Sequence, residues 1–304
     1  MNALLYMLVV FIFGTTWIAI SAQHGHITPV VAVFWRFFIA ALILFTGLCV
    51  YKRLKKLTFM DHLFCLLQGL CIFGLNFICF YNAVDYVNSG LEAVIFSMAV
   101  IFNALNSCLF FKQRISVYFI PAIVCGLLGM LALFWHNLTA TEIHGHTIFA
   151  ILLCVLGTYG FSLGNMISLR HQQHGRDVLS TNAYGMLYGA TLMAIVAVLR
   201  GEDFFPTSSG IAISALLYLA VVGSVIGFSA YFLLVGRIGA GQAAYTTLLF
   251  PLVALTLSTF WEGYQWTWSA GLGVILILLG NFILFYRPQW ILKLPYRLKS
   301  LKHQ

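Results

Sequence analysis

Charge is scarce in this sequence. Asp, Glu, Lys and Arg together make up 8% of the 304 residues, whereas they make up roughly a quarter of a soluble domain. Acidic residues are the scarcer kind, with 8 Asp and Glu against 16 Lys and Arg. A soluble domain covers its core with charged and polar side chains, so this composition excludes one. Hydrophobic residues make up 62% of the chain, which predicts a protein that lies within a lipid bilayer.

Short catalytic motifs are also absent. The sequence has no HExxH, no GxSxG and no P-loop GxxxxGK[ST]. Nothing in it therefore supports a zinc protease, a serine hydrolase of the elbow type or ATP-driven transport, and we expect neither an enzyme nor a bound cofactor. An intramembrane enzyme acting on a lipid or a peptide stays open as an alternative, because distant residues can form a catalytic pair without a sequence motif.

Cysteine and histidine give only weak signals for disulfides or metal. The seven cysteines lie in or beside apolar stretches and form no CxxC pair, so we interpret them as reduced, small hydrophobic side chains. Two HGH triplets, at 24–26 and 144–146, lie in predicted loops, with His136 and Glu142 nearby. Imidazole and carboxylate groups bind divalent metals, so a metal-ion carrier is a second alternative. The spacing of i and i+2 does not put both rings on one helix face, so the site residues that we predict include no metal ligands.

The sequence does contain a series of long apolar runs. A helix needs about 20 apolar residues to cross a bilayer, and polar or turn residues divide this chain into ten runs of about that length. The predicted membrane spans are residues 3–21, 29–51, 62–83, 90–111, 117–135, 148–169, 178–199, 210–235, 242–260 and 268–286. The loops between them are short, so we expect the function to reside within the membrane.

Loop charges predict the orientation of these spans. Lys and Arg residues are concentrated in cytoplasmic loops of membrane proteins. Here alternate loops and the C-terminal tail hold Lys52, Arg53, Lys55, Lys56, Lys112, Arg114, Arg170, Arg176, Arg237, Arg287, Lys293, Arg297, Lys299 and Lys302. The opposite loops hold only Arg200. We therefore expect a protein of the cell inner membrane with an even number of spans and both termini in the cytoplasm. We expect the positive charge to face the bilayer surface and not to bind nucleic acid.

The two halves of the chain resemble each other. "FGTTW" (13–17) parallels "LGTYG" (156–160), and residues 80–102 align without a gap on residues 231–253. Each half holds five predicted spans, so the second must cross the membrane in the opposite sense to the first. We expect residues 1–135 and 148–286 to be two inverted repeats and 287–304 to be a basic cytoplasmic tail. Inverted repeats are common among secondary transporters, which bind substrate near the midplane.

The chain resembles the EamA family of the drug/metabolite transporter superfamily along nearly its whole length. The features that carry the resemblance are Gly14–Trp17, Pro29, Arg36, "YNAVDYVNSGLEAVIFSMAVIFNALNSCLFFKQRIS" (81–116) and "GRIGAGQAAYTTLLFPLVALTLSTFWEGYQWT" (236–267). The resemblance implies transport of a small metabolite, often an amino acid. The family usually has proline in the fourth span and glutamate in the loop after it. Val100 and Gln113 stand there, which predicts a straighter fourth span, whereas the second half keeps Pro251 and Glu262.

Two ionisable residues in the spans are candidates for function. Arg36 lies inside the second span, and its counterpart in the second half is Gly185. A charge within the membrane predicts a functional site, so we expect Arg36 to bind a substrate anion or to be the counter-ion of a carboxylate such as Glu92. Glu92 opens the fourth span. It suits proton exchange, because an apolar environment favours a protonated carboxyl group, but it also suits a helix start.

Other polar and aromatic residues complete the predicted substrate or gating site. They are Trp17, Asn76, Tyr81, Asn82, Asn103, Tyr159, Asn165, Tyr231 and Tyr245. Each one alone is also typical of contacts between membrane helices. Together they predict a central cavity that binds an amphipathic organic solute, with proton or ion coupling and alternating access.

Overall fold

The computed structural model describes residues 2–23, 26–83, 86, 89–113, 115–135, 145–205, 210–261 and 266–286. Within these ranges every regular element is a helix. Helical segments lie in each of the ten predicted spans, although several spans consist of two or three segments. The predicted tail, 287–304, lies outside the described residues.

The helices of the first half begin and end as follows: α1 Asn2–Ser21, α2 Pro29–Val50, α3 Phe59–Gln68, η1 Gly69–Leu75, α4 Asn76–Ala83, α5 Ser89–Ser97, α6 Ala99–Phe111 and α7 Phe119–Leu133. Those of the second half are α9 Gly145–Gln173, α10 Val178–Arg200, α11 Gly210–Tyr218, η2 Leu219–Ile226, α12 Gly227–Ile238, α13 Ala240–Ala244, η3 Tyr245–Leu248, α14 Phe250–Trp261 and α15 Trp268–Tyr286.

Local sequence signals account for several helix ends. Thr58 and Asp61 form a reciprocal capping box at the start of α3, which satisfies two backbone N–H groups. The Asp177 carboxylate accepts from the Ser180 backbone N–H and caps α10. Gly201 ends α10 in the left-handed conformation with φ of 67°, where glycine has no steric cost. Both acids therefore fix the positions of helix starts at one end of the bundle.

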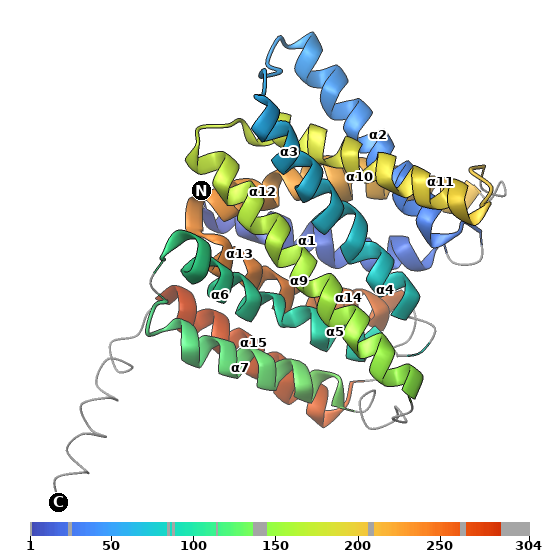
Figure 1. Ribbon diagram of the computed structural model, residues 1–304. Coiled ribbons are helices and arrows are strands. Elements are labelled where there is room, and N and C mark those ends of the chain that lie inside the picture. The colour runs from blue at the N-terminus through green and yellow to red at the C-terminus, as the bar shows by residue number, and fades with distance from the viewer. Residues whose placement is uncertain are drawn as a thin grey trace, which may run out of the picture.

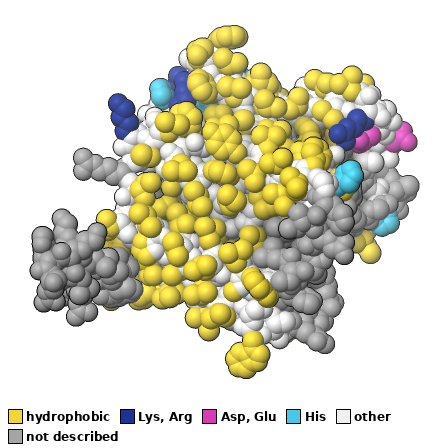
Figure 2. Space-filling view, turned by 60° about the horizontal axis from the view of Figure 1, so that its bottom comes forward, with side chains coloured by type: hydrophobic (Ala, Val, Ile, Leu, Met, Phe, Trp, Pro, Cys, Tyr) yellow, Lys and Arg dark blue, Asp and Glu magenta, His cyan; other side chains and the backbone are white. Residues whose placement is uncertain are grey.

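Length and hydropathy make much of the molecule compatible with a membrane. Six helical stretches are long and apolar enough to span a bilayer. They are 29–50, 59–83, 94–111, 145–173, 178–200 and 210–238, and shorter apolar stretches cover 2–16, 119–133 and 268–284. Figure 2 shows hydrophobic side chains across most of the visible face, with Lys, Arg, Asp, Glu and His confined to its edges. The protein is therefore an all-helical membrane protein in its described parts.

Two helices change winding in the middle of a predicted span. η1 and η2 are π-helices, and each is continuous with α-helices on both sides, α3 and α4 for η1 and α11 and α12 for η2. π-helices are rare and are frequent at functional sites. The fourth span is also interrupted, at Met98 between α5 and α6. This interruption needs no proline, since a tight i→i−3 bond from the Met98 N–H to the Ile95 C=O ends α5; the straighter fourth span stays a prediction.

Helix packing brings the two halves of the chain into contact throughout. α7 packs along α15, and α2 packs along α10; Figure 1 shows α7 and α15 side by side at the bottom of the view. α1 packs on α12 and α14, while α9 packs on α4 and α6. Between these helices lies one large apolar core, with Phe37, Phe73 and Phe232 almost fully buried in it.

Candidate functional site

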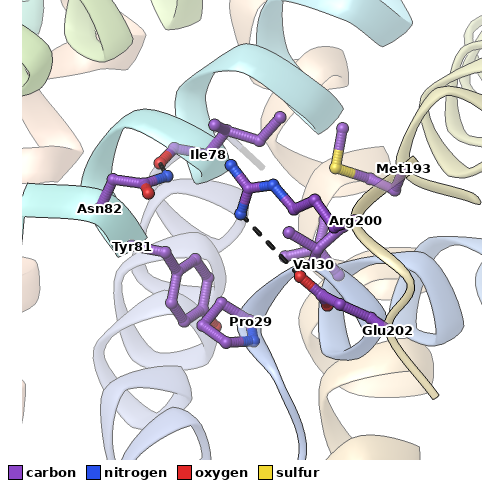
Figure 3. A pocket seen from close by; sticks show the side chains of 9 residues that line it. Pro29, Val30, Ile78, Tyr81, Asn82, Met193, Arg200 and Glu202 are labelled. Carbon is purple, nitrogen blue, oxygen red and sulfur yellow. Dashed lines mark hydrogen bonds and ion pairs between the residues drawn. The ribbon is translucent and has the colours of Figure 1, made fainter. Parts of the chain in front are cut away.

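A pocket lies where α2 begins and where α4 and α10 end, which we name the Pro29 end of the bundle. Its volume is about 210 Å³. The residues that line it are Pro29, Val30, Val33, Ile78, Tyr81, Asn82, Met193, Arg200 and Glu202. Two of the predicted site residues, Tyr81 and Asn82, therefore share a wall of one pocket (Figure 3).

Opposite charges stand at the mouth of this pocket. The Arg200 guanidinium points from α10 towards the wall that α4 forms, and its Nη1 lies 3.9 Å from the Glu202 carboxylate (Figure 3). The Thr28 hydroxyl donates to the other oxygen of Glu202, at 2.5 Å. Glu202 thus joins the segment before α2 to the segment after α10. Arg200 is half exposed, so its pairing with Glu202 contributes little to stability.

Arg36 lies one helical turn deeper than Val33, on the same side of α2. Its side chain is buried, at 5% exposure. The Nε–H donates to the Ser224 hydroxyl in η2 at 2.9 Å, and the guanidinium carbon lies 5.3 Å from the ring centres of both Phe37 and Phe77. These rings supply cation–π stabilisation.

No carboxylate among the described residues pairs with Arg36. Among the described residues the ion pairs involve Arg170, Arg176 and Arg200, not Arg36. The expected pairing of Arg36 with Glu92 is therefore not present in this structure. Glu92 sits instead beside α9, and the described contacts of Arg36 are with neutral groups.

Tyr81 connects the pocket to Arg36. Its side chain lines the pocket, and its hydroxyl is close enough to the Arg36 guanidinium for the two groups to interact electrostatically. The pocket and the buried cation are thus neighbours, since Val33, one helical turn from Arg36, lines the pocket too. Asn82, the other amide on this wall, donates to the Ile78 carbonyl of its own helix at 2.7 Å.

A second polar cluster lies in the core between α6, α9 and α12. The Asn165 amide donates to the Asn103 side-chain oxygen at 3.1 Å and to the Tyr231 hydroxyl at 3.0 Å. All three side chains are fully buried. The Asn165 side-chain oxygen has no hydrogen-bond partner in the described part of the chain. Three of the predicted residues therefore meet in one network, which holds three helices together.

The remaining predicted residues lie apart from these two clusters. The Asn76 amide donates to the Gly157 carbonyl at 3.0 Å and joins α4 to α9. The Tyr245 hydroxyl donates to the Ala122 carbonyl at 2.5 Å, in a space that Gly126 leaves open, since a Cβ there would lie 2.8 Å from the hydroxyl. Both residues fix contacts between helices. Trp17 lies in α1, and its side chain is outside those described.

Tyr159 faces outward. It is 36% exposed and shares an apolar stripe of α9 with Ile148, Leu152 and Leu156, which are more exposed. Its ring contacts that of Phe102, with centroids 5.5 Å apart. The structure therefore does not bring Tyr159 to the polar interior, because its position on α9 turns it to the surface that lipid covers.

Glu92 is buried in an apolar setting. It is 5% exposed, one carboxylate oxygen has no hydrogen-bond partner among the described residues, and it interacts electrostatically with the Cys154 thiol of α9. Ile95 of α5 and Ala150 of α9 belong to the small apolar cluster at this contact. Glu92 also lies in the first turn of α5, where the helix dipole favours an acidic side chain.

Sequence reasoning missed two groups that the structure brings together. Ser224 is the partner of Arg36; a lone serine in an apolar run gave no signal. Asp61, almost fully buried, pairs with Arg176 at 2.9 Å and lies 3.8 Å from Arg170. A signal for Asp61 did exist, because it is one of two acids among the loops that hold nearly all of the Lys and Arg residues.

The two HGH triplets lie partly outside the described residues, which omit His24, His136, Glu142 and His144. The His146 ring stacks on Tyr86, with centroids 5.5 Å apart. Within the described ranges no three His, Cys, Asp or Glu side chains gather into a metal-binding group.

The apolar exterior and the series of long apolar helices are those of a multi-pass membrane protein. The chain belongs to the EamA-like transporter family, whose sequence model matches residues 1–135 and 148–286. It is therefore a membrane transporter, and its small-molecule substrate and lipid environment follow from that class.

Relatives match along nearly the whole chain, and two of the three reported next carry transporter or efflux-pump names. Protein PagO of Salmonella typhimurium is 28% identical and covers 92% of this chain and 91% of its own. The uncharacterised transporter YoaV of Bacillus subtilis is 25% identical, with coverage of 90% and 93%. A probable amino-acid metabolite efflux pump of Salmonella typhimurium is 24% identical, with coverage of 93% and 94%.

The fold also matches a solved structure. A protein crystal structure superimposes with a TM-score of 0.81 at 13% identity, covering 95% of this chain and 98% of the other. The arrangement of helices is therefore one that is known from experiment.

Proposed function

We propose that the protein is a secondary carrier that moves a small organic metabolite bearing a carboxylate, such as an amino acid or a related amphipathic solute, by alternating access. The single observation that carries the proposal is Arg36, a buried guanidinium whose contacts in the described part of the chain are all with neutral groups. A buried cation without a counter-ion is costly, and an anionic substrate would neutralise it. The name of one relative, an amino-acid metabolite efflux pump, fits this class of solute.

The second part of the proposal is that ten helices form two inverted repeats, 1–135 and 148–286. Exchange of the halves preserves the helix contacts: α1 with α12 and α14 corresponds to α9 with α4 and α6, and α2 with η2 corresponds to α10 with η1. The π-helices and the interruptions at Met98 and Leu249 also occur at corresponding positions. Because each half has five helices, an odd number, the second half crosses the bilayer in the opposite sense to the first, as in the inverted repeats of transporters.

The third part concerns orientation. We place the protein in the inner membrane with both termini in the cytoplasm. Nearly all loop Lys and Arg residues lie at the end opposite Pro29. Because such residues are concentrated in cytoplasmic loops, the Pro29 end faces outward. Reporters attached near residues 140 and 173 test this directly. The prediction is opposite sides of the membrane, with 173 inside, and reporters on the same side would contradict it.

Transport without ATP is tested with purified protein in liposomes. A panel of labelled amino acids, their decarboxylated amines and their carboxamides is added outside, with no nucleotide present. The prediction is saturable uptake of at least one carboxylate, with the matching amine or carboxamide transported much more slowly. Equal transport of all three forms would contradict the role of a carboxylate.

Proton coupling is the remaining part of the proposal. Glu92 is buried, and one of its oxygens has no hydrogen-bond partner in the described ranges. Its counterpart in the second half is Ala243. A carboxyl group in such a setting can take up and release a proton as solvent reaches it from alternate sides. Glu92 is the residue that we assign to this step.

A further inference from the structure

We infer that Ser224 is a positioning residue for Arg36: it holds the guanidinium so that the terminal edge, formed by Nη1 and Nη2, meets the substrate carboxylate. The inference rests on the proposed function and adds to it the geometry of recognition. A guanidinium has five N–H donors, and its terminal edge matches the two oxygens of a carboxylate. Which edge is free depends on which donor the protein occupies.

The contacts of Arg36 leave the terminal edge free. The Nε–H is the donor that the protein occupies, through its 2.9 Å bond to the Ser224 hydroxyl. The Phe37 and Phe77 rings, each 5.3 Å from the guanidinium carbon, are apolar neighbours that accept no strong hydrogen bond. Nη1 and Nη2 donate to no acceptor among the described residues. Rotation about the Nε bond is thus restrained while the bidentate edge stays available.

Gly223 provides room beside that edge. A Cβ at residue 223 would lie 3.4 Å from Nη2 of Arg36 and 3.0 Å from a methyl carbon of Thr16. Gly223 and Ser224 are consecutive residues of the π-helix η2. Gly223 therefore leaves room between the helix and the terminal nitrogens, while Ser224 binds Nε. A π-helix changes the directions in which neighbouring side chains point, which suits this division.

The repeat shows that the helix contact itself does not need this pair. In the register of the repeat, Arg36 corresponds to Gly185 and Ser224 to Phe73. The Phe73 ring lies 3.3 Å from the place that a Cβ of Gly185 would take. The same contact between a second helix and a π-helix is thus filled by a phenyl ring in one half and by a hydrogen-bonded guanidinium in the other. The helix packing is satisfied either way, so we assign the polar pair to recognition.

The first experiment compares Ser224→Ala, Ser224→Thr and a control, Ser229→Ala, in liposomes. The probe is the labelled amino acid that wild type takes up fastest, with its carboxamide as competitor. Ser229 is also a buried serine of the same helical stretch and accepts from a neutral amide, Asn182, at 3.2 Å. For Ser224→Ala we expect KM to rise about tenfold, because one hydrogen bond to a charged group is lost. The maximal rate per molecule should change little. Ser224→Thr keeps the hydroxyl and should restore KM, while the control should match wild type.

The second experiment needs no substrate. Phenylglyoxal reacts with the terminal nitrogens of a free guanidinium, and mass spectrometry measures the adduct on the peptide that contains Arg36. We expect slower modification in Ser224→Ala, where the guanidinium turns, and wild-type rates in Ser224→Thr and Ser229→Ala. Gly223→Ala, which crowds Nη2 without removing the serine, should slow it too.

The outcomes separate the two ideas. Wild type that transports no member of the panel would overturn the proposed function, while the phenylglyoxal rates would still decide the role of Ser224. Wild-type KM and wild-type modification in Ser224→Ala would overturn the positioning role. An equal loss in Ser224→Ala and Ser224→Thr would also overturn it, since it would assign the effect to packing and not to the hydroxyl.

Discussion

In the proposed repeat, the contact between α2 and η2 corresponds to the contact between α10 and η1, but the first is polar and the second is apolar. The first holds a charge, Arg36, hydrogen-bonded to Ser224. The second holds Gly185 and the fully buried Phe73, without a charged group at the contact. The chain therefore allows the same kind of helix contact to be compared with and without a buried charge.

Close approach distinguishes the second contact. A Cβ on Gly69 would lie 2.6 Å from the Gly185 carbonyl oxygen, and one on Gly189 would lie 2.6 Å from the Cβ of Phe73. Such small-residue contacts hold membrane helices together by van der Waals packing. The first contact instead buries a cation, which costs free energy. We therefore propose that the α10 contact stabilises the fold, whereas the α2 contact gives up stability for binding.

The largest effect on stability is expected from Phe73→Ala. Truncation of this ring leaves a cavity between η1 and α10, and such changes cost about 3–5 kcal/mol. Thermal unfolding in detergent should show the loss, while KM for the transported amino acid should rise less than in Ser224→Ala, because Phe73 reaches Arg36 only through the Phe37 ring. A raised KM with unchanged unfolding would mean that the two contacts share one function.

Gly69→Ala is expected to cost about 1–3 kcal/mol, because the added methyl group meets backbone atoms that cannot move aside cheaply. The matched control is Gly47→Ala in α2, where a Cβ meets no atom within 4 Å. Unfolding temperatures of the two variants in one detergent make the comparison. Equal temperatures would show that η1 and α10 do not pack as closely as described here.

Glu92→Gln should leave stability nearly unchanged and remove the response of transport to a pH gradient. The amide cannot take up the proton, and the counterpart Ala243 shows that the fold does not need an acid there. Uptake into liposomes with and without an imposed gradient measures this. Because no ion pair joins Glu92 to Arg36 in the described structure, the effects of Glu92→Gln and Arg36→Leu should add. A gradient response that survives in Glu92→Gln would assign the carboxylate to structure alone.

The smallest effect is expected from Tyr159→Phe. This side chain lies on the exposed apolar stripe of α9, and exposed substitutions usually change stability by less than about 0.5 kcal/mol. Uptake and unfolding temperature should both match wild type. A clear loss of uptake would place Tyr159 in the transport path and would contradict the orientation of α9.

Much of the fold could be predicted from the sequence, because hydropathy acts locally. Apolar runs lie where the helices lie, and the alignment of 80–102 with 231–253 anticipates the corresponding interruptions. The π-helices could not be predicted, since their winding depends on packing: Gly69 and Phe73 meet α10, while Ser224 meets Arg36. The break at Met98 was missed because it needs no proline.

The candidate site was predicted only in part. Arg36 was evident as a charge among apolar residues, and Tyr81 and Asn82 do share a pocket. Sequence does not say which way a residue faces around a helix whose whole surface is apolar, and so Tyr159 was grouped with buried tyrosines. Ser224 was missed for the converse reason, because its role exists only through the contact between η2 and α2, which are far apart in the chain.

Transport by Arg36→Leu, measured per inserted molecule in liposomes, tests the central claim most directly. The free energy of inserting leucine into a bilayer is lower than that of arginine, so we expect normal insertion and normal or increased thermal stability. Uptake of the amino acid that wild type transports fastest should fall by roughly a hundredfold, since a buried charge that pairs with the substrate is lost. Arg36→Lys should recover only part of it, because a lysine lacks the bidentate edge. Full uptake by Arg36→Leu would contradict the claim, and so would a loss explained entirely by a lower amount of folded protein.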